Sequence, residues 1–141
     1  MSFYLDASVV VPNLVEEAGS EIVRAFIAQR EPDLVVSALV ALETSSALSR
    51  LARMGLIATD TAHRSLMRFD TWRAPYAGSH VFGPADFELA DACVRRFELG
   101  LRGPDALHAA MCLRLGHTLV TLDRRLTVAA SGLGVETATP A

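Results

Sequence analysis

Strand-like and helix-like segments alternate along the 141 residues of this chain. Short apolar runs that are typical of buried strands occupy residues 3–5, 34–37, 80–82 and 118–121, and a last one lies near Val135. Between these runs, apolar residues recur at helical spacing at residues 22–27, 39–51, 58–72 and 87–97. This alternation favours parallel βαβ units over an all-helical bundle. We therefore expect an α/β fold in which helices flank a parallel sheet.

The length and composition suit one compact domain, since a chain of this size with 51% hydrophobic residues can bury about two-thirds of its unfolded surface. We expect the domain to span residues 1–136 and residues 137–141 to form a flexible tail. The first segment lacks a basic region and contains Asp6, so it is interpreted as a core strand and not as a signal peptide. Cys93 and Cys112 lack the paired spacing of a zinc or redox motif, which indicates reduced packing residues in a cytoplasmic protein.

The basic residues exclude some classes of protein, because all 13 of them are arginine. An ordinary P-loop nucleotidase needs a lysine that reaches the terminal phosphates, and this chain has none. The net charge of -3 argues against a broad basic surface that binds nucleic acid along its length. A local cluster such as Arg95, Arg96 and Arg102 is still able to contact phosphates.

Four acidic residues are placed where side chains of different elements can meet: Asp6, Glu43, Asp105 and Asp123. Asp6 and Asp123 follow predicted strands, and a parallel sheet binds ligands outside the carboxyl ends of its strands. Each of the three aspartates also has a structural explanation, because Asp is common at a helix N-cap or in a first turn. Glu43 differs, since it lies in a helical run beside apolar residues, where an unpaired carboxylate is costly. It remains explicable without a ligand if it points to water or pairs with Arg50.

Together the four acids predict a site for a divalent cation, because hard cations prefer oxygen ligands and clustered carboxylates repel one another without one. The chemistry that such a site permits is hydrolysis of a phosphodiester by a metal-activated water. Ser8 and Thr121 each lie two residues from an acid, where a hydroxyl can orient a carboxylate or a bound water. His108 lies one helical turn after Asp105, but a lone histidine among apolar neighbours is more often a hydrogen-bonded packing residue.

The segments that carry the acids resemble a known family in their order and spacing. They read FYLDASVVV, ALVALETSSALSRL, RGPDALHAAMCLRLG and LVTLDRRL. These resemble the four acidic motifs of the PIN-domain ribonuclease family, and the match is with the small stand-alone VapC-type toxins of bacterial toxin-antitoxin pairs. The resemblance covers nearly the whole chain. It implies a single three-layer α/β/α PIN-like domain with a central parallel sheet of four to five strands.

What the resemblance implies for function is a metal-dependent endoribonuclease that cuts single-stranded or looped RNA. The family pattern makes Asp6, Glu43, Asp105 and Asp123 the residues that hold Mg²⁺ or Mn²⁺, with Thr121 or Ser8 in support. It implies two protein partners. One is a small cognate antitoxin, which typically feeds a C-terminal segment with a basic side chain toward the acidic pocket, and the other is a second copy of the chain in a homodimer. We expect the apolar partner surface within residues 39–66.

Three alternatives remain open at this point. A haloacid-dehalogenase-type phosphatase also has an Asp after its first strand, but it needs a second Asp two positions later, where this chain has Ser8. A non-catalytic PIN-like binding module would use the acidic pocket only to receive a basic peptide or an RNA partner. A PIN nuclease for DNA or for ribosomal RNA maturation would share the same acids.

Overall fold

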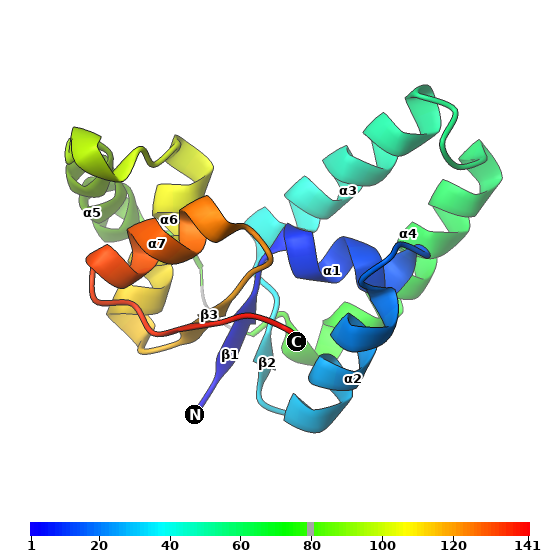
Figure 1. Ribbon diagram of the computed structural model, residues 1–141, viewed down its shortest axis with the longest axis horizontal. Helices are drawn as coiled ribbons and strands as arrows, with labels where there is room; N and C mark the ends of the chain where they lie inside the picture. The colour runs from blue at the N-terminus through cyan, green and yellow to red at the C-terminus, as the bar shows by residue number, and fades with distance from the viewer. Residues whose placement is uncertain (79–80) are drawn as a thin grey trace.

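The computed structural model describes residues 1–78 and 81–141 and contains a parallel sheet of four strands in these residues (Figure 1). The strands are β1 (Phe3–Leu5), β2 (Leu34–Val35), β3 (Thr118–Val120) and β4 (Thr137–Ala138). Their order is β2-β1-β3-β4, and all three neighbouring pairs are parallel. The order reverses between β1 and β3, because the chain first adds β2 on one side of β1 and later adds β3 on the other. A ligand site is expected at that point, beyond the carboxyl ends of β1 and β3.

Helices cover both faces of the sheet, as the α/β prediction requires. Figure 1 shows α1, α2, α3 and α4 to the right of the strands and α5, α6 and α7 to the left. The helices are α1 (Ala7–Leu14), α2 (Ser20–Arg30), α3 (Ala38–Arg53), α4 (Thr59–Arg73), α5 (Pro84–Val94), α6 (Gly103–Leu115) and α7 (Arg124–Gly132). Two 3-10 turns, η1 (Ala74–Tyr76) and η2 (Phe97–Leu99), follow α4 and α5. The predicted three-layer α/β/α arrangement is confirmed.

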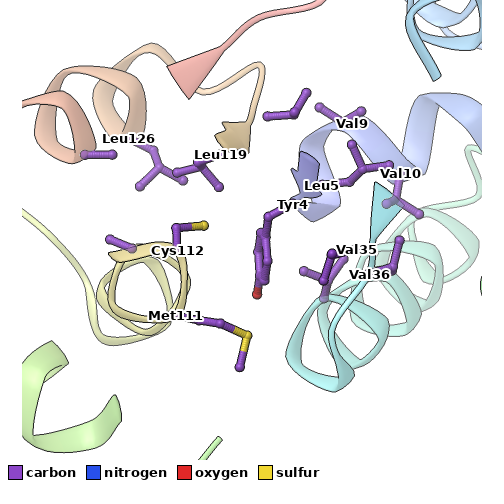
Figure 2. Close-up of a cluster of buried hydrophobic side chains, with 14 of the residues drawn as sticks. Tyr4, Leu5, Val9, Val10, Val35, Val36, Met111, Cys112, Leu119 and Leu126 are labelled. Atoms are coloured by element: carbon purple, nitrogen blue, oxygen red, sulfur yellow. The ribbon is translucent and has the colours of Figure 1, made fainter. Parts of the chain in front are cut away.

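The core lies on both sides of β1 and β3. Tyr4, Leu5, Leu119 and Val120 have no exposed surface, because each face of a parallel sheet is covered by helices. Figure 2 shows Tyr4, Leu5 and Leu119 between the helices, with Cys112 of α6 packed on the same side as Leu119. The continuous apolar runs of the strands are therefore explained by burial on two faces.

Helix α1 is not indicated by the sequence pattern. Residues 9–11 are β-branched valines, which favour strands, and Pro12 lies inside the helix. The helix forms nevertheless because residues 9–12 are buried by packing against α2 and α3. Tertiary burial thus overrides the local preference.

Two expected features at the edges of the fold differ from the structure. Of the strand predicted at residues 80–82, His80 lies outside the described residues, and Val81 and Phe82 have no regular structure. Val81 is 79% exposed, so a strand at this position would gain little stabilisation from burial of its side chain. The last strand is Thr137–Ala138 and not a segment near Val135, so it falls within residues 137–141, which were expected to be a flexible tail. It adds to the edge of β3 through hydrogen bonds from Leu119 N to Glu136 O (2.8 Å) and from Thr121 N to Ala138 O (3.2 Å).

In the described part of the chain, none of the helices has both the length and the apolar character needed to cross a membrane.

Candidate active site

Asp6 and Thr121 lie side by side because they follow adjacent strands in register. Leu5 pairs with Val120, and Asp6 N donates to Val120 O at 3.1 Å. Each residue is therefore the first beyond the carboxyl end of its strand, at the point where the strand order reverses. This places Asp6 at the position where an α/β sheet binds ligands.

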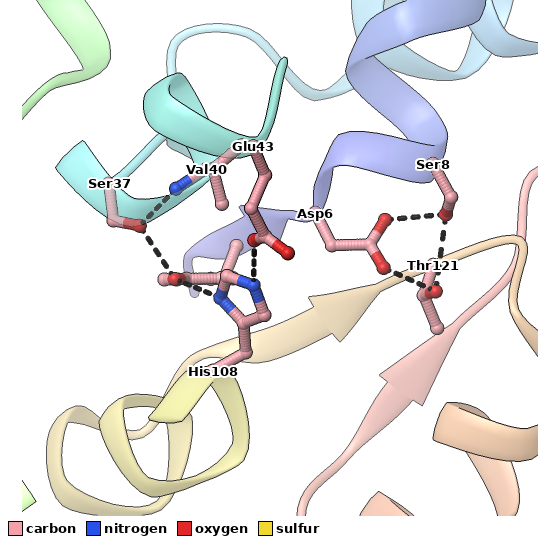
Figure 3. A network of polar contacts seen from close by, with 8 residues as sticks. Asp6, Ser8, Ser37, Val40, Glu43, His108 and Thr121 are labelled. Carbon is pink, nitrogen blue, oxygen red and sulfur yellow. Dashed lines mark hydrogen bonds and ion pairs between the residues drawn. The ribbon is translucent and has the colours of Figure 1, made fainter. Parts of the chain in front are cut away.

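The Asp6 carboxylate is 6% exposed and is held by two hydroxyl groups (Figure 3). Ser8 Oγ donates to Oδ1 and Thr121 Oγ1 donates to Oδ2, both at 2.6 Å. The two hydroxyl oxygens are 3.3 Å apart. Asp6 is also the N-cap residue of α1, but its side chain makes no capping hydrogen bond. Helix capping therefore does not explain why an acid is buried here.

Glu43 projects from α3 toward α6, where its Oε1 is bonded to Nε2 of His108 (Figure 3). The Glu43 side chain is 32% exposed, whereas that of His108 is 2% exposed. The other ring nitrogen of His108, Nδ1, is 2.7 Å from the hydroxyl of Tyr4, which is 2.7 Å from Ser37 Oγ. Ser37 is the N-cap of α3 and accepts from Val40 N at 3.2 Å. Glu43 thus pairs with a buried histidine, and not with Arg50.

Asp105 and Asp123 stand at the N-termini of two helices. Asp105 is in the first turn of α6, and Asp123 is the N-cap of α7, where its Oδ1 accepts from the backbone N–H groups of Arg125 (2.9 Å) and Leu126 (3.3 Å). Both acids line one cavity of about 280 Å³. The remaining residues that line it are Gly100, Leu101, Arg102, Arg125 and Leu126.

Burial and neighbouring charge both act on Asp6. Loss of water raises the pKa of Asp6 above its ordinary value, and the negative charge of Glu43 raises it further. The hydrogen bonds from Ser8 and Thr121 and the charge of His108 oppose this rise only in part. The ionised form of Asp6 is therefore disfavoured in the folded protein.

Asp105 has the same kind of environment. Burial is the largest cause that raises its pKa, and the negative charges of Asp123 and Glu43 add to it. His108 and Arg102 lower the pKa by a smaller amount. Because Asp6 and Asp105 both respond to Glu43, the acids from β1, α3, α6 and α7 form one electrostatic cluster.

The residues of this cluster suit a hard divalent cation, because its acidic members offer only carboxylate oxygens. Within residues 1–78 and 81–141, no three Asp, Glu, His or Cys side chains are placed to hold an ion as they stand. Their present partners explain this. Asp6 is bonded to hydroxyl groups, Glu43 to His108, and Asp123 to backbone amides.

The roles of some residues at the site are not predicted by the sequence. The sequence pattern does not indicate a role for Tyr4 or Ser37, although Tyr4 lies in β1 two residues before Asp6 and Ser37 is the N-cap of the helix of Glu43. His108 is the hydrogen-bonded buried residue that was expected, but its partner is an acid of the site. The three arginines expected to contact phosphates do not lie together. Arg95 and Arg96 pair with Asp91 and Glu98 at the surface, and of the three only Arg102 lines the cavity.

Comparison with known proteins identifies the family. The PIN domain family matches residues 3–131, which is most of the chain, and the chain therefore belongs to the PIN domain family. A comparison with curated proteins found no match.

Solved structures with the same fold cover nearly the whole chain. FitAcB from Neisseria gonorrhoeae is 17% identical with a TM-score of 0.76, over 98% of this chain and 97% of that one. PAE2754 from Pyrobaculum aerophilum is 26% identical with a TM-score of 0.68, over 97% of this chain and 83% of that one. VapC20 of Mycobacterium tuberculosis, a toxin that cleaves the sarcin-ricin loop, is 18% identical with a TM-score of 0.71, over 91% of this chain and 95% of that one.

Proposed function

We propose that this protein is a metal-dependent endoribonuclease toxin that hydrolyses RNA phosphodiester bonds with a metal-activated water and is neutralised by a cognate antitoxin. The observation that carries the proposal is the cluster of four acids from separate elements, in which the pKa values of Asp6 and Asp105 are raised. A divalent cation would remove the repulsion that the cluster otherwise sustains. Membership of the PIN domain family supports the same reaction class, and VapC20, which shares the fold, is a toxin that cleaves the sarcin-ricin loop.

In this proposal Asp6, Glu43, Asp105 and Asp123 hold Mg²⁺ or Mn²⁺. When bound, the ion lowers the pKa of a coordinated water and stabilises charge that builds on the phosphoryl oxygens. One of the carboxylates accepts the proton of the attacking water. Ser8 and Thr121 keep the Asp6 carboxylate in place through both of its oxygens.

Arg102 and Arg125 supply the positive charge that RNA requires beside the acids. Both line the cavity that contains Asp105 and Asp123. Helix α7 has Arg124 and Arg125 in its first turn, directly after Asp123, whose carboxylate caps the helix. Guanidinium groups pair with phosphate oxygens, and we propose that Arg102 and Arg125 contact a phosphate of the RNA backbone.

An apolar groove between α1 and α3 suits the antitoxin. This cavity of about 480 Å³ has Val11, Leu51 and Leu56 on its walls and extends to Ser8, which is bonded to Asp6. An apolar antitoxin segment in the groove would bring an adjoining basic side chain to the acidic cluster. A toxin-antitoxin complex from Klebsiella pneumoniae is a solved structure of the same fold, with a TM-score of 0.70.

We also propose that the chain forms a homodimer through residues 39–66. This segment exposes Leu42, Met54 and Leu56, each by more than half, and Met67 follows directly after it. Met54 and Leu56 also line the antitoxin groove, so the two proposed partner surfaces adjoin there. Exposed apolar side chains gathered on one segment mark a partner surface. Gel filtration that gives a monomer at every concentration would contradict this part of the proposal.

The alternative is a non-catalytic PIN-like module whose acidic pocket receives a basic peptide or RNA. The two functions are separated by cleavage of total RNA with purified wild-type and Asp6→Asn protein, in magnesium, in manganese and in EDTA. Discrete fragments that form only with the wild type and metal support the nuclease. No cleavage by folded, antitoxin-free wild-type protein under any condition favours the binding module.

A further inference from the structure

A continuous series of hydrogen bonds connects the N-terminus of α3 to the carboxylate of Glu43 (Figure 3). It runs from Val40 N to Ser37 Oγ (3.2 Å), then to the Tyr4 hydroxyl (2.7 Å), then to His108 Nδ1 (2.7 Å), and ends with the bond between His108 Nε2 and Glu43 Oε1. The four links join α3, which carries Glu43, α6, which carries Asp105, and β1, which Asp6 directly follows.

When the imidazole of His108 is neutral, the hydrogen bonds in this series all run toward Glu43. An ionised carboxylate only accepts hydrogen bonds, so Nε2 of His108 carries a hydrogen. In the neutral imidazole, Nδ1 then has no hydrogen and accepts from the Tyr4 hydroxyl. The single hydrogen of the Tyr4 hydroxyl is then used, so its oxygen accepts from Ser37 Oγ, which itself accepts from Val40 N. Each donor in the series has an acceptor, and the last donor, Nε2 of His108, donates to the carboxylate of Glu43.

Glu43 needs such support more than Asp6 and Asp123 do. Its side chain is longer than theirs and is 32% exposed, so holding it in one rotamer costs conformational entropy. Asp6 is fixed by two hydroxyl groups and Asp123 by two backbone amides. For Glu43 the corresponding contact is the buried ring of His108, itself fixed by Tyr4.

We propose that His108, oriented by Tyr4 and Ser37, is a positioning residue that holds the Glu43 carboxylate where it contributes to cation binding. This inference rests on the proposed function and adds to it a residue outside the four acids. His108 acts through Glu43 and touches neither the ion nor the RNA. Outer partners of metal ligands typically change metal affinity when they are removed.

The test measures the dissociation constant of Mn²⁺ alone by titration of the purified full-length protein. His108→Leu removes the donor and is expected to weaken Mn²⁺ binding about tenfold. His108→Gln keeps an N–H in reach of Glu43 and is expected to restore most of the affinity. Tyr4→Phe removes only the hydroxyl and should weaken binding by a smaller factor, whereas Tyr76→Phe, the matched control outside the series, should leave it unchanged.

A second measurement separates positioning from general stabilisation of the core. In a Glu43→Gln background, His108→Leu should add no further loss of Mn²⁺ affinity, because its effect passes through the carboxylate. Full additivity of the two losses would overturn the inference. If His108→Leu does not fold, Tyr4→Phe and His108→Gln in the same background decide the question in its place.

The outcomes also distinguish this inference from the proposed function. Wild-type protein that binds Mn²⁺ and cleaves RNA, with Glu43→Gln weakened but Tyr4→Phe and His108→Leu equal to wild type, would overturn the inference alone. Wild-type protein that neither binds Mn²⁺ nor cleaves RNA would overturn both.

Discussion

Thr121 Oγ1 donates to Asp6 Oδ2 at 2.6 Å, although the two residues are 115 positions apart in the sequence. The contact follows from the pairing of β1 with β3, which places the residues after Leu5 and Val120 side by side. Asp6 is consequently buried among hydroxyl groups and near Glu43, and its pKa is raised.

Replacement of Asp6 by Asn should abolish cleavage and leave the metal-free fold intact. Loss of a proposed metal ligand is expected to lower the rate by about 100-fold or more. The free energy of unfolding in EDTA should stay equal or rise by about 1 kcal/mol, because a disfavoured buried charge is removed. Cleavage assays and urea denaturation measure the two effects, with Asp70→Asn on the exposed surface of α4 as the control. A clear loss of metal-free stability would instead assign Asp6 a structural role.

The stability of the metal-free protein should depend on pH through Asp6. Its pKa in the folded state lies above the ordinary 3.8, so the folded state binds more protons than the unfolded state between these two values. The penalty is absent below 3.8 and is complete above the folded pKa, so stability falls as pH rises through that interval. The groups that act on this carboxyl are Ser8, Thr121, His108 and Glu43.

Denaturation across this pH interval in EDTA, compared between wild type and Asp6→Asn, measures the effect. The wild type should lose stability relative to the variant as pH rises, and Mn²⁺ should reduce the difference. Parallel curves for the two proteins would show that burial of Asp6 carries no such penalty.

Arg125 should contribute to RNA affinity more than its neighbour Arg124. Arg125 lines the cavity beside Asp105 and Asp123, whereas Arg124 does not. In the cleavage-inactive Asp6→Asn protein, Arg125→Ala is expected to weaken binding of a single-stranded RNA oligonucleotide about tenfold and to reduce the salt slope by about 0.7. Arg124→Ala is a matched control in the same helical turn. Equal losses from both variants would indicate general charge attraction and not a phosphate site in the cavity.

The pair formed by Asp86 and Arg114 should stabilise the packing of α5 on α6, the helix that carries Asp105. Asp86 is 1% exposed and accepts from Nε (2.6 Å) and Nη2 (2.9 Å) of Arg114 and from Gly83 N (2.9 Å). Arg114→Met should lower the Tm by several degrees, because it leaves a buried carboxylate without its main partner. Arg95→Met, which breaks the exposed pair with Asp91, is the control and should change the Tm little.

The stabilisation by the pair of Asp86 and Arg114 should be lost at acidic pH. Arg114 lowers the pKa of Asp86 below its ordinary 3.8, so the stabilisation is present above 3.8 and is lost as pH falls through the folded value. Thermal denaturation of wild type and Arg114→Met should therefore converge at low pH. A constant difference in Tm across the whole range would mean that packing of the arginine stem, and not the ion pair, is responsible.

Features that depend on neighbouring residues in the chain are predicted well. The alternation of strands and helices follows from local hydrophobic spacing, and the place of Asp6 after β1 follows from the end of an apolar run. The relation of Ser8 to Asp6 is also local, since the two residues are two positions apart and share a turn. Asp123 caps α7 as an Asp before a helix commonly does.

Features that depend on contacts between distant elements are decided by packing. Glu43 and His108 are 65 positions apart, and only the approach of α3 to α6 makes the histidine its partner in place of Arg50. Residues 81–82 have strand-like character but Val81 remains exposed, whereas Thr137 and Ala138 form a strand because the edge of β3 is there to receive them. Local sequence sets the backbone preference of each segment, but the partner of a side chain or of a strand edge exists only after the layers have assembled.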